Sequence, residues 1–171
     1  MKAITDRIRK VPDFPKKGIL FYDVTPVLQD PVSFGAVLEA LVEPFERKKV
    51  EIVCGIESRG FIFGAAVAND LGAGFVPVRK PGKLPWNKKK QEYDLEYGKD
   101  ALEMHVDAIQ PGQRVLIIDD LLATGGTALA TIQLLRQFGA EIVGASFVIE
   151  LKALGGRKRL ENVDIRTLLA V

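Results

Sequence analysis

The sequence has few of the residues on which many metal and nucleophile sites are built, with one Cys and one His among 171 residues. Cys54 alone can form neither an intramolecular disulfide nor a Cys-based zinc site. A Ser-His-Asp triad would have to use His105. That residue lies in an alternating stretch that predicts a surface strand, and we do not expect it to be catalytic.

Long apolar runs and an excess of charge of one sign are also missing. No run approaches the roughly 20 residues of a membrane span, and charges spread through the first ten residues argue against a secretory signal. The 24 basic and 22 acidic residues leave a net charge of +2, which argues against nucleic-acid binding over the whole surface. We therefore expect a cytoplasmic enzyme or binding protein.

The order of expected elements indicates one α/β domain over residues 1–171. Ile4, Ile8 and Val11 at helical spacing predict a first helix, and Asp30-Pro31 predicts the capped start of another with a broad apolar face. Strands and helices then alternate: strands 52–56, 75–78, 114–118 and 141–150, and helices 60–71 and 127–138. This alternation predicts a mostly parallel sheet flanked by helices. Between residues 81 and 98 it breaks, in a long polar segment typical of a lid or a disordered loop.

The most informative segment is Val115–Thr127. Four apolar residues lead to Asp119 and Asp120 at the carboxyl end of a predicted strand, where open α/β sheets bind ligands. A small turn with two glycines then opens a helix, so consecutive backbone N–H groups and the helix dipole point at one spot. We expect a monophosphate to bind there, at Ala123, Thr124, Gly125, Gly126 and Thr127.

The acid pair identifies what is attached to that phosphate. No Lys follows the glycines, so the segment is not a P-loop, and a dinucleotide fingerprint is absent. Carboxylates repel a phosphate, but they accept hydrogen bonds from hydroxyl groups one sugar ring away. The segment therefore predicts a ribose 5-phosphate site in which Asp119 and Asp120 face the 2′ and 3′ hydroxyls.

Two further segments favour a second anion. Glu57-Ser58-Arg59-Gly60 lies between a strand and a helix, and its N–H groups and the Arg59 fork suit pyrophosphate oxygens. Residues 79–90 hold six cations and no acid. A lysine run such as Lys88–Lys90 is most often a solvated loop, and we take that interpretation for these three residues.

These segments together resemble the type I phosphoribosyltransferases, in the form carried by the members that act on adenine. The resemblance covers essentially the whole chain in order, through residues 12–15, 18–26, 55–61, 95–98, 119–127 and 150–151. It implies the type I phosphoribosyltransferase fold, with a small N-terminal hood at about residues 1–30 and a flexible lid at about residues 82–95. It also implies a cis peptide bond, which we place at Glu57–Ser58.

The resemblance implies roles for individual residues. It implies that the pyrophosphate is bound by Glu57, Ser58, Arg59, Arg79, Lys80 and Lys83. Adenine would be held by Leu20, Phe21 and Leu151. Catalysis would involve Arg59, with Glu96 as general acid or base and Tyr97 polarising the departing diphosphate.

The implied reaction joins adenine to phosphoribosyl diphosphate and gives AMP and pyrophosphate, a step of purine salvage. Magnesium would arrive on the substrate, without a dedicated protein metal site, and a homodimer is expected. Three alternatives stay open. A xanthine or hypoxanthine phosphoribosyltransferase would share the sugar site. A purine-responsive DNA-binding regulator would need a further module, for which we expect no room, and a ribose-phosphate binding module would need neither the lid nor Glu96.

Overall fold

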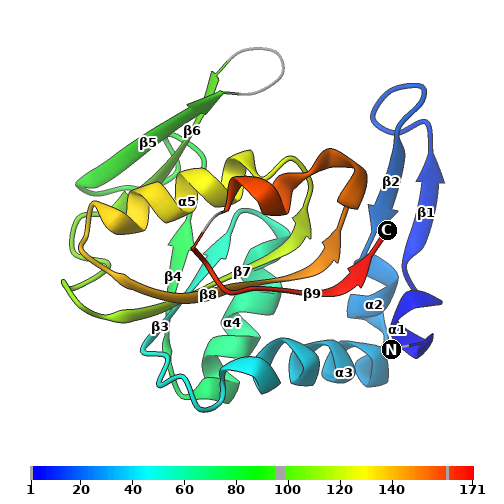
Figure 1. Cartoon of the computed structure of the whole chain (residues 1–171), viewed down its shortest axis with the longest axis horizontal. Coiled ribbons are helices and arrows are strands. Elements are labelled where there is room, and N and C mark those ends of the chain that lie inside the picture. Colours follow the sequence, from blue (N-terminus) through cyan, green and yellow to red (C-terminus); the bar gives the residue numbers. More distant parts are fainter. Residues whose placement is uncertain (1, 95–98, 161) are drawn as a thin grey trace. The chain divides into compact units, whose positions relative to one another are not determined.

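The computed structural model describes residues 2–94, 99–160 and 162–171 and divides into two compact units, residues 1–40 and 41–171. The first unit contains α1 (Lys2–Thr5), the strands β1 (Arg9–Pro12) and β2 (Leu20–Asp23), α2 (Thr25–Gln29) and most of α3 (Pro31–Val42). Strands β1 and β2 form an antiparallel hairpin (Figure 1).

The predicted helix over residues 4–11 is wrong. The helix α1 ends at Thr5, and from Arg9 the chain runs as β1, paired with β2. Ile4 and Ile8 are nevertheless both buried, so the apolar spacing does mark residues that face a core. Ile4 lies in α1 and Ile8 in the bend before β1. Three apolar residues at helical spacing are too few to predict a helix, because backbone pairing with β2 decides the conformation from Arg9 onward.

The predicted start of α3 is confirmed. The Asp30 carboxylate accepts a hydrogen bond from the backbone N–H of Ser33 at 2.9 Å, and Pro31 occupies the first helical position. This side-chain oxygen satisfies an N–H that lacks a partner inside the helix. Along the expected apolar face, Val37 and Leu41 are fully buried, and Phe45 follows in η1 (Glu43–Phe45).

The second unit is built on a parallel five-stranded sheet in the order β4-β3-β7-β8-β9. Its strands are β3 (Ile52–Ile56), β4 (Gly74–Val78), β7 (Arg114–Leu122), β8 (Glu141–Glu150) and β9 (Ile165–Ala170). The helices α4 (Arg59–Leu71) and α5 (Gly126–Arg136) lie on opposite sides of the sheet (Figure 1). The predicted parallel sheet flanked by helices is thus confirmed, and β9 is an addition to it.

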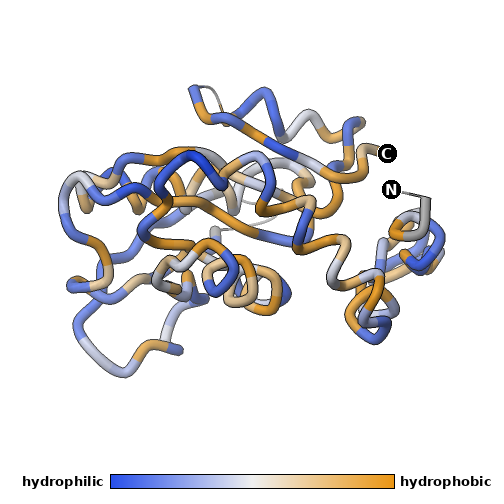
Figure 2. The backbone as a smooth tube through the Cα atoms, turned by 90° about the horizontal axis from the view of Figure 1, so that it is seen from below, coloured by the Kyte–Doolittle hydropathy of each residue, from blue (hydrophilic) through white to orange (hydrophobic). Residues whose placement is uncertain are grey.

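The core of this unit lies along the two central strands. Val115–Ile118 of β7 and Phe147–Ile149 of β8 are completely buried. Figure 2 colours the backbone by hydropathy and shows hydrophobic stretches, in orange, separated by hydrophilic ones. A strand covered on both faces needs apolar residues at consecutive positions. That requirement explains why both strands could be recognised as apolar runs.

An antiparallel hairpin, β5 (Lys88–Asp94) and β6 (Lys99–His105), replaces much of the irregular segment expected between residues 81 and 98. The prediction that Lys88–Lys90 form a loop is wrong, because all three residues lie in β5, but Lys88 and Lys90 are exposed to solvent as expected. Lys89 places its ammonium 4.2 Å from the centroid of the Phe138 ring, and Lys90 pairs with Glu92 at 2.8 Å. The sequence of β5 does not alternate between apolar and polar residues. The buried apolar residues of this hairpin, Leu102 and Met104, lie on β6 instead.

The end of the chain pairs with β8 as strand β9, and an ion pair between the buried Glu150 and the half-exposed Arg157 supports this arrangement. After β8 come η2 (Lys152–Leu154) and η3 (Gly156–Arg159). The Glu150 carboxylate accepts hydrogen bonds from Arg157 at 2.6 and 3.0 Å and from Thr167 on β9 at 3.1 Å. The bonds from Arg157 lower the pKa of Glu150, burial opposes this change, and the bond from Thr167 adds to it.

No helix among the described residues is both long enough and apolar enough to cross a membrane. Cys54 is free and lies in the core on β3, where burial raises the pKa of its thiol.

The ion pair predicts a pH-dependent stability. Because the pKa of Glu150 is lower in the folded chain, its contribution is complete above the ordinary glutamate pKa of about 4.3 and is lost as pH falls through the lowered value. Glu150→Gln should reduce the free energy of unfolding at neutral pH by roughly 2 kcal/mol, through the loss of charge-assisted hydrogen bonds. Urea unfolding at decreasing pH should show this deficit shrinking.

The matched control is Glu141→Gln, at the exposed start of the same strand. Glu141 pairs with Arg114, and an exposed pair contributes at most about 1 kcal/mol. A deficit for Glu150→Gln that equals the control, or that is unchanged at acidic pH, would contradict the prediction.

Candidate functional site

A pocket of about 300 Å³ lies where β3 and β7 leave the sheet. It is lined by Glu57, Ser58, Arg59, Lys80 and the continuous segment Asp119–Ala128. Segments that are far apart in the sequence and were predicted to bind one ligand therefore lie around one cavity. Parallel strands explain this arrangement, because their carboxyl ends meet at the same edge of the sheet.

The acid pair lies inside β7 rather than after it, because the strand continues to Leu122 instead of ending at Ile118. Asp119 and Asp120 are only 9% and 5% exposed. Burial, together with the neighbouring Asp120 carboxylate, raises the pKa of Asp119, although Asp119 accepts a hydrogen bond from the backbone N–H of Asp120 at 2.9 Å. The two nearly buried aspartates therefore line the pocket.

Helix α4 approaches this acid pair closely because its second residue is a glycine. A Cβ atom on Gly60 would lie 2.8 Å from Oδ1 of Asp119 and 2.9 Å from the carbonyl oxygen of Ile118. The helix begins at Arg59, whose Nε pairs with Oδ2 of Asp120. The predicted pyrophosphate ligand Arg59 thus contacts the predicted ribose ligand Asp120. The Glu57–Ser58 peptide bond before the helix is cis, as the resemblance implied.

The glycine turn joins β7 to α5 as predicted. Gly125 has φ +79° and immediately precedes the helix, and its carbonyl oxygen accepts a hydrogen bond from the N–H of Leu129 at 2.9 Å. Gly156 of η3 packs directly on this turn, where a Cβ atom on Gly156 would lie 2.8 Å from the nitrogen of Gly125. The turn therefore presents the helix N-terminus to the pocket on one side and is supported by η3 on the other.

Glu57 accepts hydrogen bonds from three basic residues that were predicted to bind the diphosphate. Its carboxylate accepts hydrogen bonds from Nζ of Lys83 at 2.7 Å, the backbone N–H of Lys80 at 3.0 Å and Nε of Arg79 at 3.3 Å. Burial by itself would raise the pKa of Glu57, but these bonds outweigh burial and lower it. Glu57 is thus a charged residue that holds the segment of Arg79, Lys80 and Lys83 beside the pocket.

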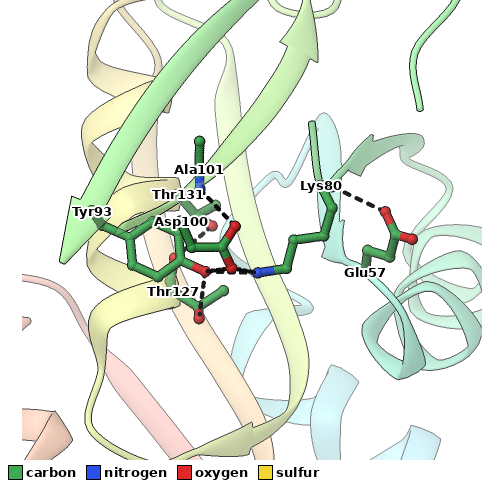
Figure 3. Close-up of polar contacts among 7 residues, drawn as sticks. All are labelled: Glu57, Lys80, Tyr93, Asp100, Ala101, Thr127 and Thr131. Atoms are coloured by element: carbon green, nitrogen blue, oxygen red, sulfur yellow. Dashed lines mark hydrogen bonds and ion pairs between the residues drawn. The ribbon is translucent and has the colours of Figure 1, made fainter. Parts of the chain in front are cut away.

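The Lys80 side chain points away from Glu57 to a second acid (Figure 3). Its ammonium donates to the hydroxyl of Tyr93 at 2.8 Å and to the carboxylate of Asp100. Burial would lower the pKa of Lys80, but the bonds to Asp100 and Tyr93 raise it. The Thr127 hydroxyl at the start of α5 lies 3.5 Å from the same Tyr93 oxygen.

Leu151, another predicted site residue of the second unit, does not line this pocket. Leu151 follows β8 and donates its N–H to the carbonyl of Leu122 at 2.9 Å. Leu20 and Phe21 lie on β2 in the first unit. Glu96 and Tyr97 fall outside the residues that the structure describes.

Sequence reasoning missed Tyr93, Asp100 and Gly156. Tyr93 and Asp100 are direct partners in the antiparallel register of β5 and β6, so recognising that hairpin would have placed them side by side. Gly156 carries no local signal, since its packing against Gly125 depends on the path of the chain after β8.

The fold and this pocket define a phosphoribosyl transferase domain. The family model described as the phosphoribosyl transferase domain matches residues 28–169. An adenine phosphoribosyltransferase from Agrobacterium fabrum is 56% identical over 164 residues, covering 95% of this chain and 91% of that protein.

Solved structures of adenine phosphoribosyltransferases have the same fold as this chain. The adenine phosphoribosyltransferase of Rhodothermus marinus superposes with a TM-score of 0.96 at 54% identity, covering 99% of this chain and 97% of that one. The adenine phosphoribosyltransferase of Saccharomyces cerevisiae, solved with an imino-altritol bisphosphate and adenine, superposes with a TM-score of 0.93 at 42% identity. The match covers 98% of this chain and 97% of that one. The chain belongs to the adenine phosphoribosyltransferase family.

The packing of η3 on the glycine turn predicts that Gly156→Ala destabilises the chain. The three atoms nearest to the added methyl group are backbone atoms, so the turn has to move. Overpacking of this kind costs roughly 2 kcal/mol. Urea unfolding measures the change. The control is Gly35→Ala in α3, where an added Cβ atom would meet nothing within 4 Å. This substitution should stabilise the helix by about 0.5–1 kcal/mol. Equal effects of the two substitutions would contradict the predicted clash.

Proposed function

We propose that the pocket transfers the 5-phosphoribosyl group of phosphoribosyl diphosphate to adenine, giving AMP and pyrophosphate, the purine-salvage reaction of its family. The observation that carries this proposal is the continuous segment Asp119–Thr127, which places two buried carboxylates beside a helix N-terminus in one cavity. A sugar ring that carries both hydroxyl groups and a phosphate ester matches those two chemistries.

The sugar phosphate is proposed to bind along this segment. Its phosphate accepts hydrogen bonds from the backbone and hydroxyl groups of residues 123–127, where the helix dipole adds partial positive charge. Asp119 and Asp120 accept hydrogen bonds from the 2′ and 3′ hydroxyls. Because both carboxylates are already immobilised, the ring is oriented with little further loss of side-chain freedom.

The diphosphate is proposed to bind between α4 and the cations held by Glu57. Positive charge there comes from the side chains of Arg59, Arg79, Lys80 and Lys83. The Glu57-Ser58 turn contributes backbone N–H groups that can donate hydrogen bonds to the diphosphate. Fixed charges of this kind stabilise a leaving group on which negative charge develops. The transition state then resembles an oxocarbenium ion whose bond to pyrophosphate is largely broken.

Magnesium is proposed to be held mainly by the substrate's own oxygens. The carboxylates at the pocket suit this assignment, because Asp120 is paired with Arg59, and Glu57 is paired with Arg79 and Lys83. Carboxylates that already hold cations differ from the ligands of a protein magnesium cage. When bound, the metal neutralises charge on the diphosphate.

The base and the proton step are assigned through the family resemblance. Leu20, Phe21 and Leu151 would hold adenine, Glu96 would take or return the proton, and Tyr97 would polarise the departing diphosphate. Residues of about 82–95 would act as a lid that excludes water, and residues of about 1–30 as a hood. We further propose one functional domain, a homodimer and a cytoplasmic location.

A panel of purines tests the proposed reaction. With phosphoribosyl diphosphate and magnesium, adenine should support pyrophosphate release, while hypoxanthine, xanthine and guanine should support little, since base choice depends on a few hydrogen bonds. Pyrophosphate is measured by a coupled assay, with a reaction lacking base as the control. Turnover with hypoxanthine or xanthine in place of adenine would favour the rival enzyme, and no turnover with any purine would favour a binding module.

Glu96→Gln tests the proton step. If Glu96 is the general acid or base, the substitution should lower the single-turnover rate by roughly 10²–10⁴-fold, with little change in the affinity for phosphoribosyl diphosphate. Glu141→Gln, at the exposed start of β8, is the matched control. An unchanged single-turnover rate in Glu96→Gln would exclude this role.

A further inference from the structure

Tyr93, which has been assigned no substrate contact of its own, is the centre of a small polar network (Figure 3). It lies on β5 directly opposite Asp100 on β6. Its hydroxyl lies 2.8 Å from Nζ of Lys80, 3.0 Å from Oδ2 of Asp100 and 3.5 Å from Oγ1 of Thr127. One side chain of the hairpin therefore reaches both a pocket-lining cation and the first turn of α5.

The network satisfies the hydrogen-bonding capacity of the tyrosine hydroxyl. The hydroxyl donates its proton to Asp100 and accepts from Lys80 and Thr127, which uses one donor and two acceptor positions. Asp100 also accepts a hydrogen bond from the N–H of Ala101 at 2.8 Å, so its carboxylate is itself held in place. The proton of Tyr93 is thus directed to Asp100, and its lone pairs face Lys80 and Thr127.

This arrangement limits the positions open to Lys80. An ammonium group has three N–H donors, and two of them are directed to Tyr93 and Asp100. Without these partners, the four-carbon stem of a half-exposed lysine would sample many rotamers. With them, Lys80 is held where it lines the pocket, and its third N–H can be directed to a bound anion.

The network also supports the phosphate turn. Thr127 belongs to the segment proposed to bind the 5-phosphate, and its carbonyl oxygen accepts a hydrogen bond from Oγ1 of Thr131 at 3.0 Å. The first turn of α5 is therefore fastened from within the helix by Thr131 and from the hairpin by Tyr93.

We propose that Tyr93 is a positioning residue for the binding of phosphoribosyl diphosphate. It holds Lys80 against the diphosphate site and links that cation to the phosphate turn through Thr127. Asp100 orients the Tyr93 hydroxyl for this purpose. The inference rests on the proposed function, because it assigns the pocket to a phosphorylated sugar.

The test is Tyr93→Phe, which removes the hydroxyl and keeps the ring, whose centroid lies 5.4 Å from Nζ of Lys80. Calorimetric binding of phosphoribosyl diphosphate with magnesium should weaken about fivefold, the effect of one lost hydrogen bond. In steady-state assays KM for that substrate should rise by a similar factor, with kcat changed less than twofold. The matched control is Asp107→Asn on the exposed turn after β6, which should leave binding unchanged.

A double-mutant cycle separates positioning from a general structural effect. Lys80→Met should itself weaken binding, and Tyr93→Phe should then add clearly less in that background than in the wild type, because its effect passes largely through Lys80. Thermal unfolding of each variant shows that the comparison is made between folded proteins. Equal effects of Tyr93→Phe in both backgrounds, or unchanged binding in the single variant, would overturn the proposal.

Direct binding also separates this inference from the proposed function. Wild-type protein that binds phosphoribosyl diphosphate but does not react with adenine would contradict the proposed reaction and leave the role of Tyr93 measurable. Wild-type turnover with adenine, together with unchanged binding in Tyr93→Phe, would contradict the inference alone.

Discussion

The parallel pairing of β3 with β7 is the constraint on which the rest of the site depends. It aligns Gly55 with Ile118, so the turn after β3 and the acid pair of β7 leave the sheet at one edge. Gly60 then allows α4 to pack against Asp119, and Gly156 allows η3 to pack against the glycine turn. With larger side chains at these two positions the same segments could not surround one cavity, because backbone atoms already occupy the space that a Cβ atom would need.

The electrostatics of the pocket follow from the same alignment. Each of three carboxylates holds cations that the family resemblance assigns to the diphosphate: Glu57 holds Arg79 and Lys83, Asp100 holds Lys80, and Asp120 holds Arg59. Without neighbouring carboxylates, these cations would repel one another, and their long side chains would keep their conformational freedom. Paired with carboxylates, they are already ordered before a polyanion arrives, which lowers the entropic cost of binding it.

Much of the fold could be predicted because the central strands are buried on both faces. The strands at residues 52–56 and 141–150 have the predicted bounds, and the helices beside them differ by one or two residues. Strand β5 could not be recognised, since its lysines face solvent or ring surfaces and its partner β6 supplies the apolar residues. The helix expected from Ile4 to Val11 failed for a related reason, because strand pairing with a distant segment decided the local conformation.

The sequence by itself determined the chemistry of the site. Two acids after an apolar strand, a glycine turn that opens a helix and an arginine after a second strand are local patterns, and their spacing limits what they can bind. Only the tertiary structure decided which side chains meet. Arg59 and Asp120 are 61 positions apart, and Lys80 and Asp100 are 20 apart. Such pairs depend on strand register and helix placement, which arise from burial across the whole sheet and leave no trace in local spacing.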